Sequence, residues 1–465
     1  MALSKKKSLK SLKSLKSLNI LKMETNNIRN SVNEAEKSMG QELLQSEEVI
    51  KMIQIVEKFL RDKKLICYGG TAINNILPKK DQFYDYKTEV PDYDFFSPNA
   101  LKDTKQLADI FYKNGFIDGV DAKGGIHEGT YKIFVNYIPI ADITQLNKEI
   151  YKNISKETID VDGILYAPPN YLRMSMYLEL SRPKGDVGRW EKVFKRLALL
   201  NKNYPLKSQN CKIIKKQKED TIFIDLKNIL FMFDVIFFGG YAMLLYSKFG
   251  PSKTYNVPTF DILSIDPKKL IKNIIQELNK INIENIEIIK HKNLGEIIPS
   301  HYEIIINNTT YCFVYNTLGC HNYNIINIDK KNIKIATIDT MLSFYLAFIY
   351  SNNEYYDSNR ILCMCDFLFN IQKKRVLKDE PLLKRFSIGC DGRQHTLIDA
   401  RITKSDMWEK YKCNRESTGF KKWFFKYDPA NPKPHIYKSR TKSCKMKQNK
   451  LKNKLKNKLK SKQSN

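Results

Sequence analysis

The chain has 465 residues, enough for two or three domains with sizeable cores, and its formal net charge is +29. No apolar run approaches the roughly 20 residues that a membrane-spanning helix needs, and residues 1–22 lack the apolar core of a secretory signal. These features argue against a membrane protein and a secreted protein, and they favour a partner rich in negative charge.

The positive charge is concentrated at the two ends. Residues 1–22 contain seven lysines and residues 438–465 contain twelve Lys or Arg, without any acidic residue in either segment, which leaves +10 for the body. Lys-Ser-Leu occurs four times in succession between Lys7 and Leu18. We predict a disordered low-complexity arm there, with a basic amphipathic helix as the alternative, and a disordered tail at the other end.

The nine cysteines are scattered and form no CxxC pair or Cys/His cluster of zinc-ligand spacing. This usage predicts reduced cysteines in an intracellular, reducing compartment. The histidines form no cluster either, and we interpret them as packing or surface residues.

The first confident helix is predicted over residues 42–61, where apolar residues recur at helical spacing. It leads into a short apolar strand, residues 65–68, which runs into Gly69-Gly70-Thr71 and a helix to Leu77. Glycines at a sharp strand-to-helix turn are typical of places where the backbone must approach a ligand closely.

Residues 91–97 are predicted as a strand that carries Asp92 and Asp94. Alternate residues of a strand share a face, so the two carboxylates should project side by side. A third acid, Asp142, lies in another strand-like run, residues 137–143, which follows the strand 130–135 after a tight turn. The rival pair Asp160 and Asp162 precedes Gly163 and is interpreted as solvated turn residues.

A glycine turn with three strand-borne carboxylates is the pattern that two-metal phosphoryl transfer requires. Backbone N–H groups at the turn receive a triphosphate, and the acids hold two hard cations. The pattern resembles the nucleotidyltransferase superfamily of DNA polymerase beta and the poly(A) polymerases. Gly69-Gly70-Thr71-Ala72, Pro91-Asp92-Tyr93-Asp94-Phe95-Phe96 and residues 171–190 resemble more closely the poly(A) polymerase catalytic subunit of poxviruses and giant nucleocytoplasmic DNA viruses.

This resemblance implies an enzyme that adds AMP from ATP to the 3′ end of viral mRNA, without a template. It implies Asp92, Asp94 and Asp142 as catalytic ligands of two Mg²⁺ or Mn²⁺ ions. It also implies that Gly69, Gly70, Thr71 and Lys184 bind ATP; for Lys184 a solvated basic turn is an equal alternative on the residues alone. The implied partners are an RNA primer and a processivity subunit or a second copy of the chain, with no membrane. The implied location is the virion and the host cytoplasm, in the viral factory.

The first pattern returns further along the chain. An apolar run from residue 230 leads to Gly239-Gly240, and Asp261 then matches Asp94, whereas Thr259 replaces Asp92 and Phe313 falls where Asp142 would lie. A lone Asp cannot hold two divalent cations. The second copy is therefore predicted to be structural, with chance similarity as the alternative.

The predicted fold class is α/β: a nucleotidyltransferase (DNA polymerase beta-like) catalytic domain followed by a degenerate second copy of the same fold. Residues 381–437 are predicted as polar and irregular, with cations between aromatics that suit either single-stranded nucleic acid or domain docking. The predicted boundaries are 1–30 for the arm, 31–200 for the catalytic domain, 201–225 for a linker, 226–375 for the second copy, 376–437 for the basic and aromatic region, and 438–465 for the tail.

Two rival functions remain open from the sequence. A CCA-adding enzyme or a small-molecule adenylyltransferase would use the same acids. A non-catalytic RNA-binding scaffold would not need three carboxylates, and the first copy keeps all three.

Overall fold

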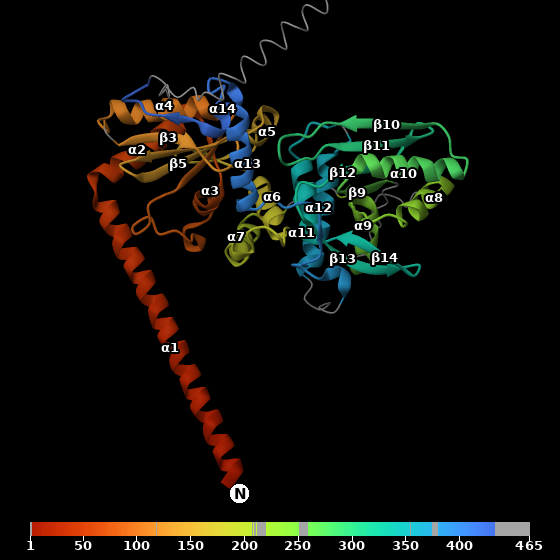
Figure 1. The fold of residues 1–465 in the computed structure, drawn as a ribbon, viewed down its shortest axis with the longest axis horizontal. Helices are drawn as coiled ribbons and strands as arrows, with labels where there is room; N and C mark the ends of the chain where they lie inside the picture. The colour runs from red at the N-terminus through yellow and green to blue at the C-terminus, as the bar shows by residue number, and fades with distance from the viewer. Residues whose placement is uncertain are drawn as a thin grey trace, which may run out of the picture.

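The computed structural model describes residues 2–117, 119–206, 208, 211, 220–250, 259–353, 355–373 and 380–432, with the backbone alone for residues 2–18. Two lobes lie side by side, each built on an eight-stranded sheet, and a long N-terminal helix, α1 (Ala2–Gln45), projects from the first lobe (Figure 1).

The sheet of the first lobe has the strand order β16-β3-β4-β5-β2-β1-β7-β6. Its strands are β1 (Ile66–Cys67), β2 (Tyr93–Ser97), β3 (Val120–Gly124), β4 (Thr130–Val135), β5 (Ile138–Gln145), β6 (Ile159–Val161), β7 (Ile164–Tyr166) and β16 (Lys426–Tyr427). Its helices are α2 (Glu47–Lys63), α3 (Gly69–Ile76), η1 (Lys79–Asp81), α4 (Ala100–Lys113), α5 (Lys148–Ile154), α6 (Pro169–Leu180), η2 (Val187–Arg189) and α7 (Trp190–Asn203).

Helix α2 shows how the sequence pattern covers this sheet. Val49, Met52, Val56 and Phe59 recur at helical spacing and are buried, with charged residues on the opposite face. The ring of Phe59 contacts that of Phe95 on β2, 6.4 Å between centroids. The predicted helix over residues 42–61 is in fact two helices, because α1 ends at Gln45 and α2 begins at Glu47.

The second lobe repeats this topology in the order β10-β11-β12-β9-β8-β14-β13-β15. Its strands are β8 (Ile236–Phe238), β9 (Phe260–Ser264), β10 (Ile286–His291), β11 (His301–Ile306), β12 (Thr309–Asn316), β13 (His321–Ile328), β14 (Lys331–Ala336) and β15 (Cys390–Asp391). Its helices are α8 (Thr221–Leu230), α9 (Gly239–Tyr246), η3 (Ser247–Phe249), α10 (Pro267–Lys280), α11 (Ile338–Phe348), α12 (Ser358–Lys373) and η5 (Pro381–Leu383).

Strands β8 to β14 take the places of β1 to β7 one for one, with the same parallel and antiparallel neighbours. The predicted degenerate second copy of the fold is therefore confirmed. Among the strands of the described residues, only the edge strands β16 and β15, both from the C-terminal region, fall outside the repeat.

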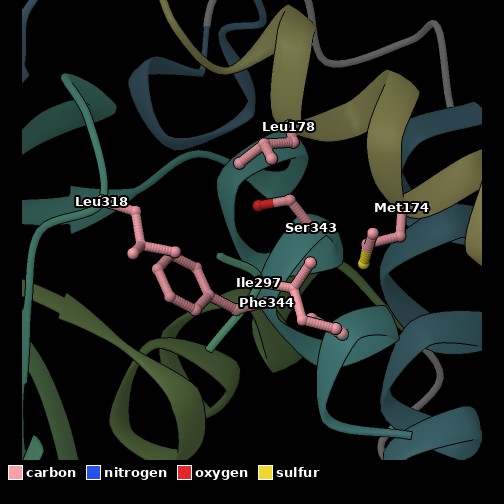
Figure 2. A pocket seen from close by; sticks show the side chains of 7 residues that line it. Met174, Leu178, Ile297, Leu318, Ser343 and Phe344 are labelled. Carbon is pink, nitrogen blue, oxygen red and sulfur yellow. The ribbon is translucent and has the colours of Figure 1, made fainter. Parts of the chain in front are cut away.

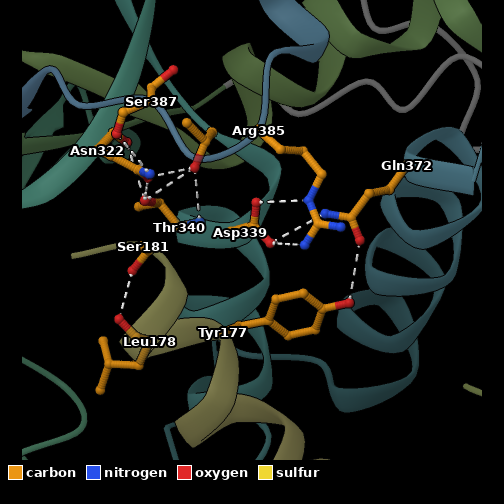
Figure 3. Close-up of polar contacts among 10 residues, drawn as sticks. Tyr177, Leu178, Ser181, Asn322, Asp339, Thr340, Gln372, Arg385 and Ser387 are labelled. Carbon is orange, nitrogen blue, oxygen red and sulfur yellow. Dashed lines mark hydrogen bonds and ion pairs between the residues drawn. The ribbon is translucent and has the colours of Figure 1, made fainter. Parts of the chain in front are cut away.

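The equivalent helices α6 and α11 pack against each other where the lobes meet. Met174 and Leu178 of α6 face Phe344 of α11 across a residual cavity of about 10 Å³ (Figure 2). Nearby, the Arg385 guanidinium binds the fully buried carboxylate of Asp339, with 2.6 Å between Nη2 and Oδ1 (Figure 3). Apolar packing between α6 and α11, together with a 3.4 Å hydrogen bond from the Tyr177 hydroxyl of α6 to Gln372 of α12, thus joins the two lobes.

Two predictions for the ends of the chain were wrong. The arm over residues 1–30 is helical from Ala2, within α1; it lacks Pro and Gly, and Leu and Lys are good helix formers. The region over residues 381–437 contains α13 (Leu397–Tyr411) and α14 (Thr418–Phe424), although its polar sequence shows little helical periodicity. The predicted disordered tail over residues 438–465 lies outside the described residues.

The prediction that all cysteines are reduced was also wrong. Disulfides join Cys211 to Cys363 and Cys320 to Cys390, and Cys413 is disulfide-bonded as well. The first two pairs are separated by 152 and 70 residues, so sequence spacing gave no sign of them. The free cysteines of the described part are Cys67, Cys312 and Cys365, all buried.

No helix among the described residues has both the length and the apolar character needed to cross a membrane.

Candidate active site

The glycine turn connects β1 to α3 at the centre of the first sheet. Gly69 has φ +75°, a left-handed conformation that favours glycine, and a Cβ there would stand 2.8 Å from Oδ2 of Asp94. The turn therefore brings backbone and carboxylate into close approach. The first N–H groups of α3 have no partner within their own helix, as at any helix N-terminus.

Asp94 and Asp142 lie directly opposite each other on the parallel strands β2 and β5. Asp92 comes immediately before β2 rather than on it, because the strand begins at Tyr93. Thr71 fixes this residue: its hydroxyl donates to the backbone oxygen of Asp92 at 2.7 Å. The side chain of Thr71 thus positions a carboxylate, a contact that sequence reasoning did not foresee.

The three carboxylates interact electrostatically. Burial, and then the negative charges of Asp92 and Asp142, raise the pKa of Asp94 to about 7. Burial and the charge of Asp142 also raise the pKa of Asp92. Carboxylates placed this close favour either protonation or a bound cation.

Lys132 of β4 supplies positive charge at this cluster, and its ammonium group binds Asp142. The residues of the tight turn, Asn136 and Tyr137, both have positive φ, and Val135 pairs with Ile138. A register shift between residues 133 and 134 then places Lys132 opposite Asp142. Without this irregularity the hairpin register would pair Asp142 with residue 131, so counting from the turn alone misses the lysine.

Two arginines that the sequence did not single out lie near the glycine turn. The Arg196 guanidinium and the Tyr84 hydroxyl, 2.6 Å apart, lie against Gly70, where a Cβ would stand 2.9 Å from Nη1 of Arg196. The positive charge of Arg189 favours the ionised form of Asp94. The site therefore combines clustered carboxylates with arginines near a helix N-terminus.

Lys184 lies exposed in the turn between α6 and η2, and its predicted contact with ATP stays a prediction. Its neighbour Arg182 lies instead against the second lobe, where a Cβ on Gly319 would stand 3.0 Å from its Nε. Burial lowers the pKa of Arg182 to about 10.

Of the rival acids, Asp162 occupies the predicted turn, whereas the prediction was wrong for Asp160, which lies on strand β6 opposite Leu165. Asp162 has φ +54° and is exposed, and Asp160 accepts a hydrogen bond from the Gly163 N–H at 2.9 Å.

The corresponding place in the second lobe is closed by aromatic side chains. Phe313 lies opposite Asp261 in the register that pairs Asp142 with Asp94. A cavity of only about 50 Å³ remains, lined by Thr259, Asp261, Phe313 and the rings of Tyr345, Phe348, Tyr355 and Tyr356. Thr259 and Phe313 thus line the position where the first lobe has Asp92 and Asp142, as the sequence predicted.

The donor atoms of the first lobe suit a hard divalent cation, since Asp92, Asp94 and Asp142 offer carboxylate oxygens alone. Across the described residues, no three His, Cys, Asp or Glu side chains are already arranged to hold a metal ion. Positive charge beside these carboxylates comes from Lys132, whose ammonium group binds Asp142.

Comparisons with known proteins agree with this geometry. Residues 54–186 match the family model described as "Poly(A) polymerase catalytic subunit". The resemblance to this family is confirmed. The matched segment includes Gly69, Gly70, Thr71, Asp92, Asp94, Asp142 and Lys184.

Individual relatives cover the same part of the chain. A candidate poly(A) polymerase catalytic subunit of Acanthamoeba polyphaga mimivirus is 36% identical over 161 residues, 33% of this chain and 26% of the relative. One of African swine fever virus (strain Badajoz 1971 Vero-adapted) is 31% identical over 203 residues, 42% of this chain and 41% of the relative. The matches thus span less than half the length of these relatives.

The whole fold has a solved counterpart. The crystal structure of the Megavirus polyadenylate synthase superposes with a TM-score of 0.74 over 93% of this chain and 89% of that chain, at 22% sequence identity. The two-lobe architecture is therefore shared beyond the segment that sequence comparison detects.

Proposed function

We propose that this chain is a template-independent polynucleotide adenylyltransferase that adds AMP from ATP to the 3′ end of messenger RNA. The observation that carries the proposal is the placement of Asp94 opposite Asp142, with Asp92 just before the same strand, beside the turn that begins α3. The likeness to poly(A) polymerase catalytic subunits over residues 54–186 supports adenylyl transfer in particular.

Asp92, Asp94 and Asp142 would hold two divalent cations, Mg²⁺ or Mn²⁺, which when bound neutralise the triphosphate and make the primer hydroxyl a better nucleophile. The chain itself positions the reactants. The glycine turn lets the triphosphate approach the N-terminal N–H groups of α3, where the helix dipole favours negative charge.

In this reaction the primer 3′ oxygen forms a bond to the α-phosphorus of ATP, and the bond to pyrophosphate breaks. Arg189 and Arg196 would add positive charge around a triphosphate bound at the glycine turn, and Lys184 in its exposed turn would be a further cation for it. Such a site catalyses phosphoryl transfer by position and charge.

The direct test is incubation of the full chain with an oligoribonucleotide, Mg²⁺ or Mn²⁺, and each of the four nucleoside triphosphates in turn. We expect long extension with ATP and little with the other three. In a further reaction that contains both CTP and ATP, addition that stops at a three-nucleotide end would identify a CCA-adding enzyme. No extension with any nucleotide, while RNA still binds, would leave the scaffold alternative.

The proposed partners are an RNA primer and ATP, and a processivity subunit or a second copy of the chain. The relatives belong to viruses, which supports viral messenger RNA as the substrate and the viral factory or the virion as the location. Co-purification with the other proteins of the same virus, followed by sizing of the complex, would separate a heteromeric partner from a homodimer.

A further inference from the structure

A cavity of about 410 Å³ lies at the edge of the first lobe, and its lining does not include Asp92, Asp94 or Asp142. Its walls are α4, through Leu101 and Lys105, and the C-terminal segment that carries α13, α14 and β16. We call it the Trp408 pocket. Its volume falls in the range of small-ligand sites, about 300–1,000 Å³.

The C-terminal segment is anchored firmly enough to shape this pocket. Strand β16 pairs with β3, and the buried ring of Phe425 contacts that of Tyr131, 5.4 Å between centroids. The Tyr427 hydroxyl donates to Asp109 of α4 at 2.5 Å. Domain docking, one of the two alternatives for this region, therefore accounts for Phe425 and Tyr427.

Three further aromatic rings line the pocket itself, with the Arg415 guanidinium 5.0 Å from the centroid of the Trp408 ring. Trp408 and Phe420 line the pocket together with Phe424, and the three rings contact one another with centroids 5.1 to 5.8 Å apart. The Trp408 side chain remains 38% exposed. A large, half-exposed aromatic surface inside a concave site offers a platform on which a flat ring can stack.

Positive charge surrounds this platform. Lys105, Arg415, Lys421 and Lys426 line the pocket against two acids, Glu416 and Asp428. Both acids already have partners: Lys421 Nζ lies 3.1 Å from Glu416, and Asp428 accepts from the Ala430 N–H at 2.9 Å. The chain also continues beyond Pro432 into residues 438–465, which hold twelve Lys or Arg and no acid.

We propose that the Trp408 pocket binds one nucleotide of single-stranded RNA, with its base on the aromatic platform and its phosphate among the lysines. This proposal rests on the proposed function for its identification of the ligand as RNA, and it adds a contact to the primer outside the catalytic site. Stacking with phosphate pairing tolerates any base, so the site strengthens binding without selecting sequence.

A primer is long enough to reach both places. Seven residues separate Asp94 from Leu101, so their Cα atoms are at most about 25 Å apart. Asp94 and the start of α4 lie at opposite ends of β2, and an oligonucleotide of about 15 nucleotides, rising about 3.4 Å each, exceeds that separation. The pocket therefore anchors the primer upstream of its 3′ end.

The test measures binding of a fluorescent oligo(A) of about 15 nucleotides to the full chain by anisotropy, without ATP or divalent metal. Trp408→Ala should weaken binding roughly 5- to 100-fold, as expected when one stacking ring is lost. Ile402→Ala on the same helix, at a side chain 55% exposed and outside the pocket, should bind as wild type does. Equal affinities for all three proteins would overturn the proposal.

Two lysine substitutions provide a test that does not depend on packing changes caused by Trp408→Ala. Lys421 and Lys422 are adjacent, both exposed and each beside one glutamate, yet Lys421 alone lines the pocket. Lys421→Glu should weaken binding several-fold more than Lys422→Glu, which changes the net charge equally. Equal losses would mean that only general electrostatic attraction operates, and would overturn the pocket as a site.

Cross-linking identifies the source of the ligand. An RNA that contains 4-thiouridine should cross-link within residues 397–432, and unlabelled RNA should compete for the cross-link while ATP does not. Competition by ATP would assign the pocket to a free nucleotide, and absence of a cross-link would leave an acidic, aromatic peptide as its ligand; either result overturns the proposal. Primer extension by the same wild-type protein tests the proposed function separately, because the cross-link requires no catalysis.

Discussion

The two lobes have the same strand order and the same glycine turn, yet they provide opposite environments at the equivalent point. In the first lobe, two carboxylates face each other across β2 and β5, with Lys132 and arginines around them. In the second, Asp261 faces the ring of Phe313 and is enclosed by aromatic side chains. Retaining a topology therefore does not retain a site, because the site depends on a few side chains at fixed register positions.

The second lobe still contributes to the packing of the molecule. Its aromatic residues form a continuous core, and α11 packs against α6 of the first lobe. We infer that the second lobe supports α6 of the first lobe, while the first lobe carries the chemistry. The following experiments test this division of roles.

The largest contrast is expected between Asp94→Asn and Asp261→Asn in primer extension. Asp94→Asn, like Asp92→Asn or Asp142→Ala, should lower the rate by about 10³-fold or more, because the carboxylates act as a unit. Asp261→Asn should change the rate less than about twofold, because Asp261 lies in the second lobe and shares no partner with the carboxylates of the first. A large loss in Asp261→Asn protein that stays folded by circular dichroism would contradict the assignment of the second lobe.

Phe313→Asp places in the second lobe the acid that the first lobe has at this position. We expect it to lower the free energy of unfolding by about 3–5 kcal/mol, since a buried ring is lost and a carboxylate is enclosed beside Asp261. Urea denaturation measures this, with Phe313→Leu as the control that keeps an apolar side chain. Unchanged stability would mean that water reaches the second site as it reaches the first.

The glycine turns provide a matched pair of smaller changes. Gly69 and Gly239 have φ +75° and +66°. A Cβ on Gly69 would clash with the Asp94 side chain, and a Cβ on Gly239 would clash with that of Asp261. Both alanine variants should lose about 1–2 kcal/mol of stability from the left-handed backbone. Only Gly69→Ala should also impair extension, measured at a temperature where both variants are folded; equal activities would contradict a role for the first turn in binding ATP.

The smallest effect is expected in the pH dependence of stability. Burial raises the pKa of Asp261 from its ordinary 3.8 to about 7. Between these values the folded state keeps a proton that the unfolded state has released, so stability falls as the pH rises. Asp261→Asn removes this titration, so its free energy of unfolding should match that of wild type near pH 4 and exceed it at about pH 8. Parallel pH profiles would place Asp261 in contact with solvent.

Local sequence patterns predicted a large part of the fold and the site. The spacing of Asp92 and Asp94, the glycine turn and the strand around Asp142 are properties of short segments, and each segment took the predicted form apart from the late start of β2. The second copy was detectable because the same short segments recur in the same order. Alignment of those segments was enough to show that Phe313 occupies the position equivalent to Asp142.

The tertiary structure alone decided the contacts between distant segments. A register irregularity in one hairpin brought Lys132 to Asp142, and α7 carried Arg196 to Gly70, 126 positions earlier in the chain. The disulfides, the aromatic closure around Asp261 and the return of Phe425 to the first sheet also join residues far apart in sequence. Periodicity and turn chemistry report on neighbouring residues, whereas these contacts depend on how whole elements pack, and no local pattern encodes that packing.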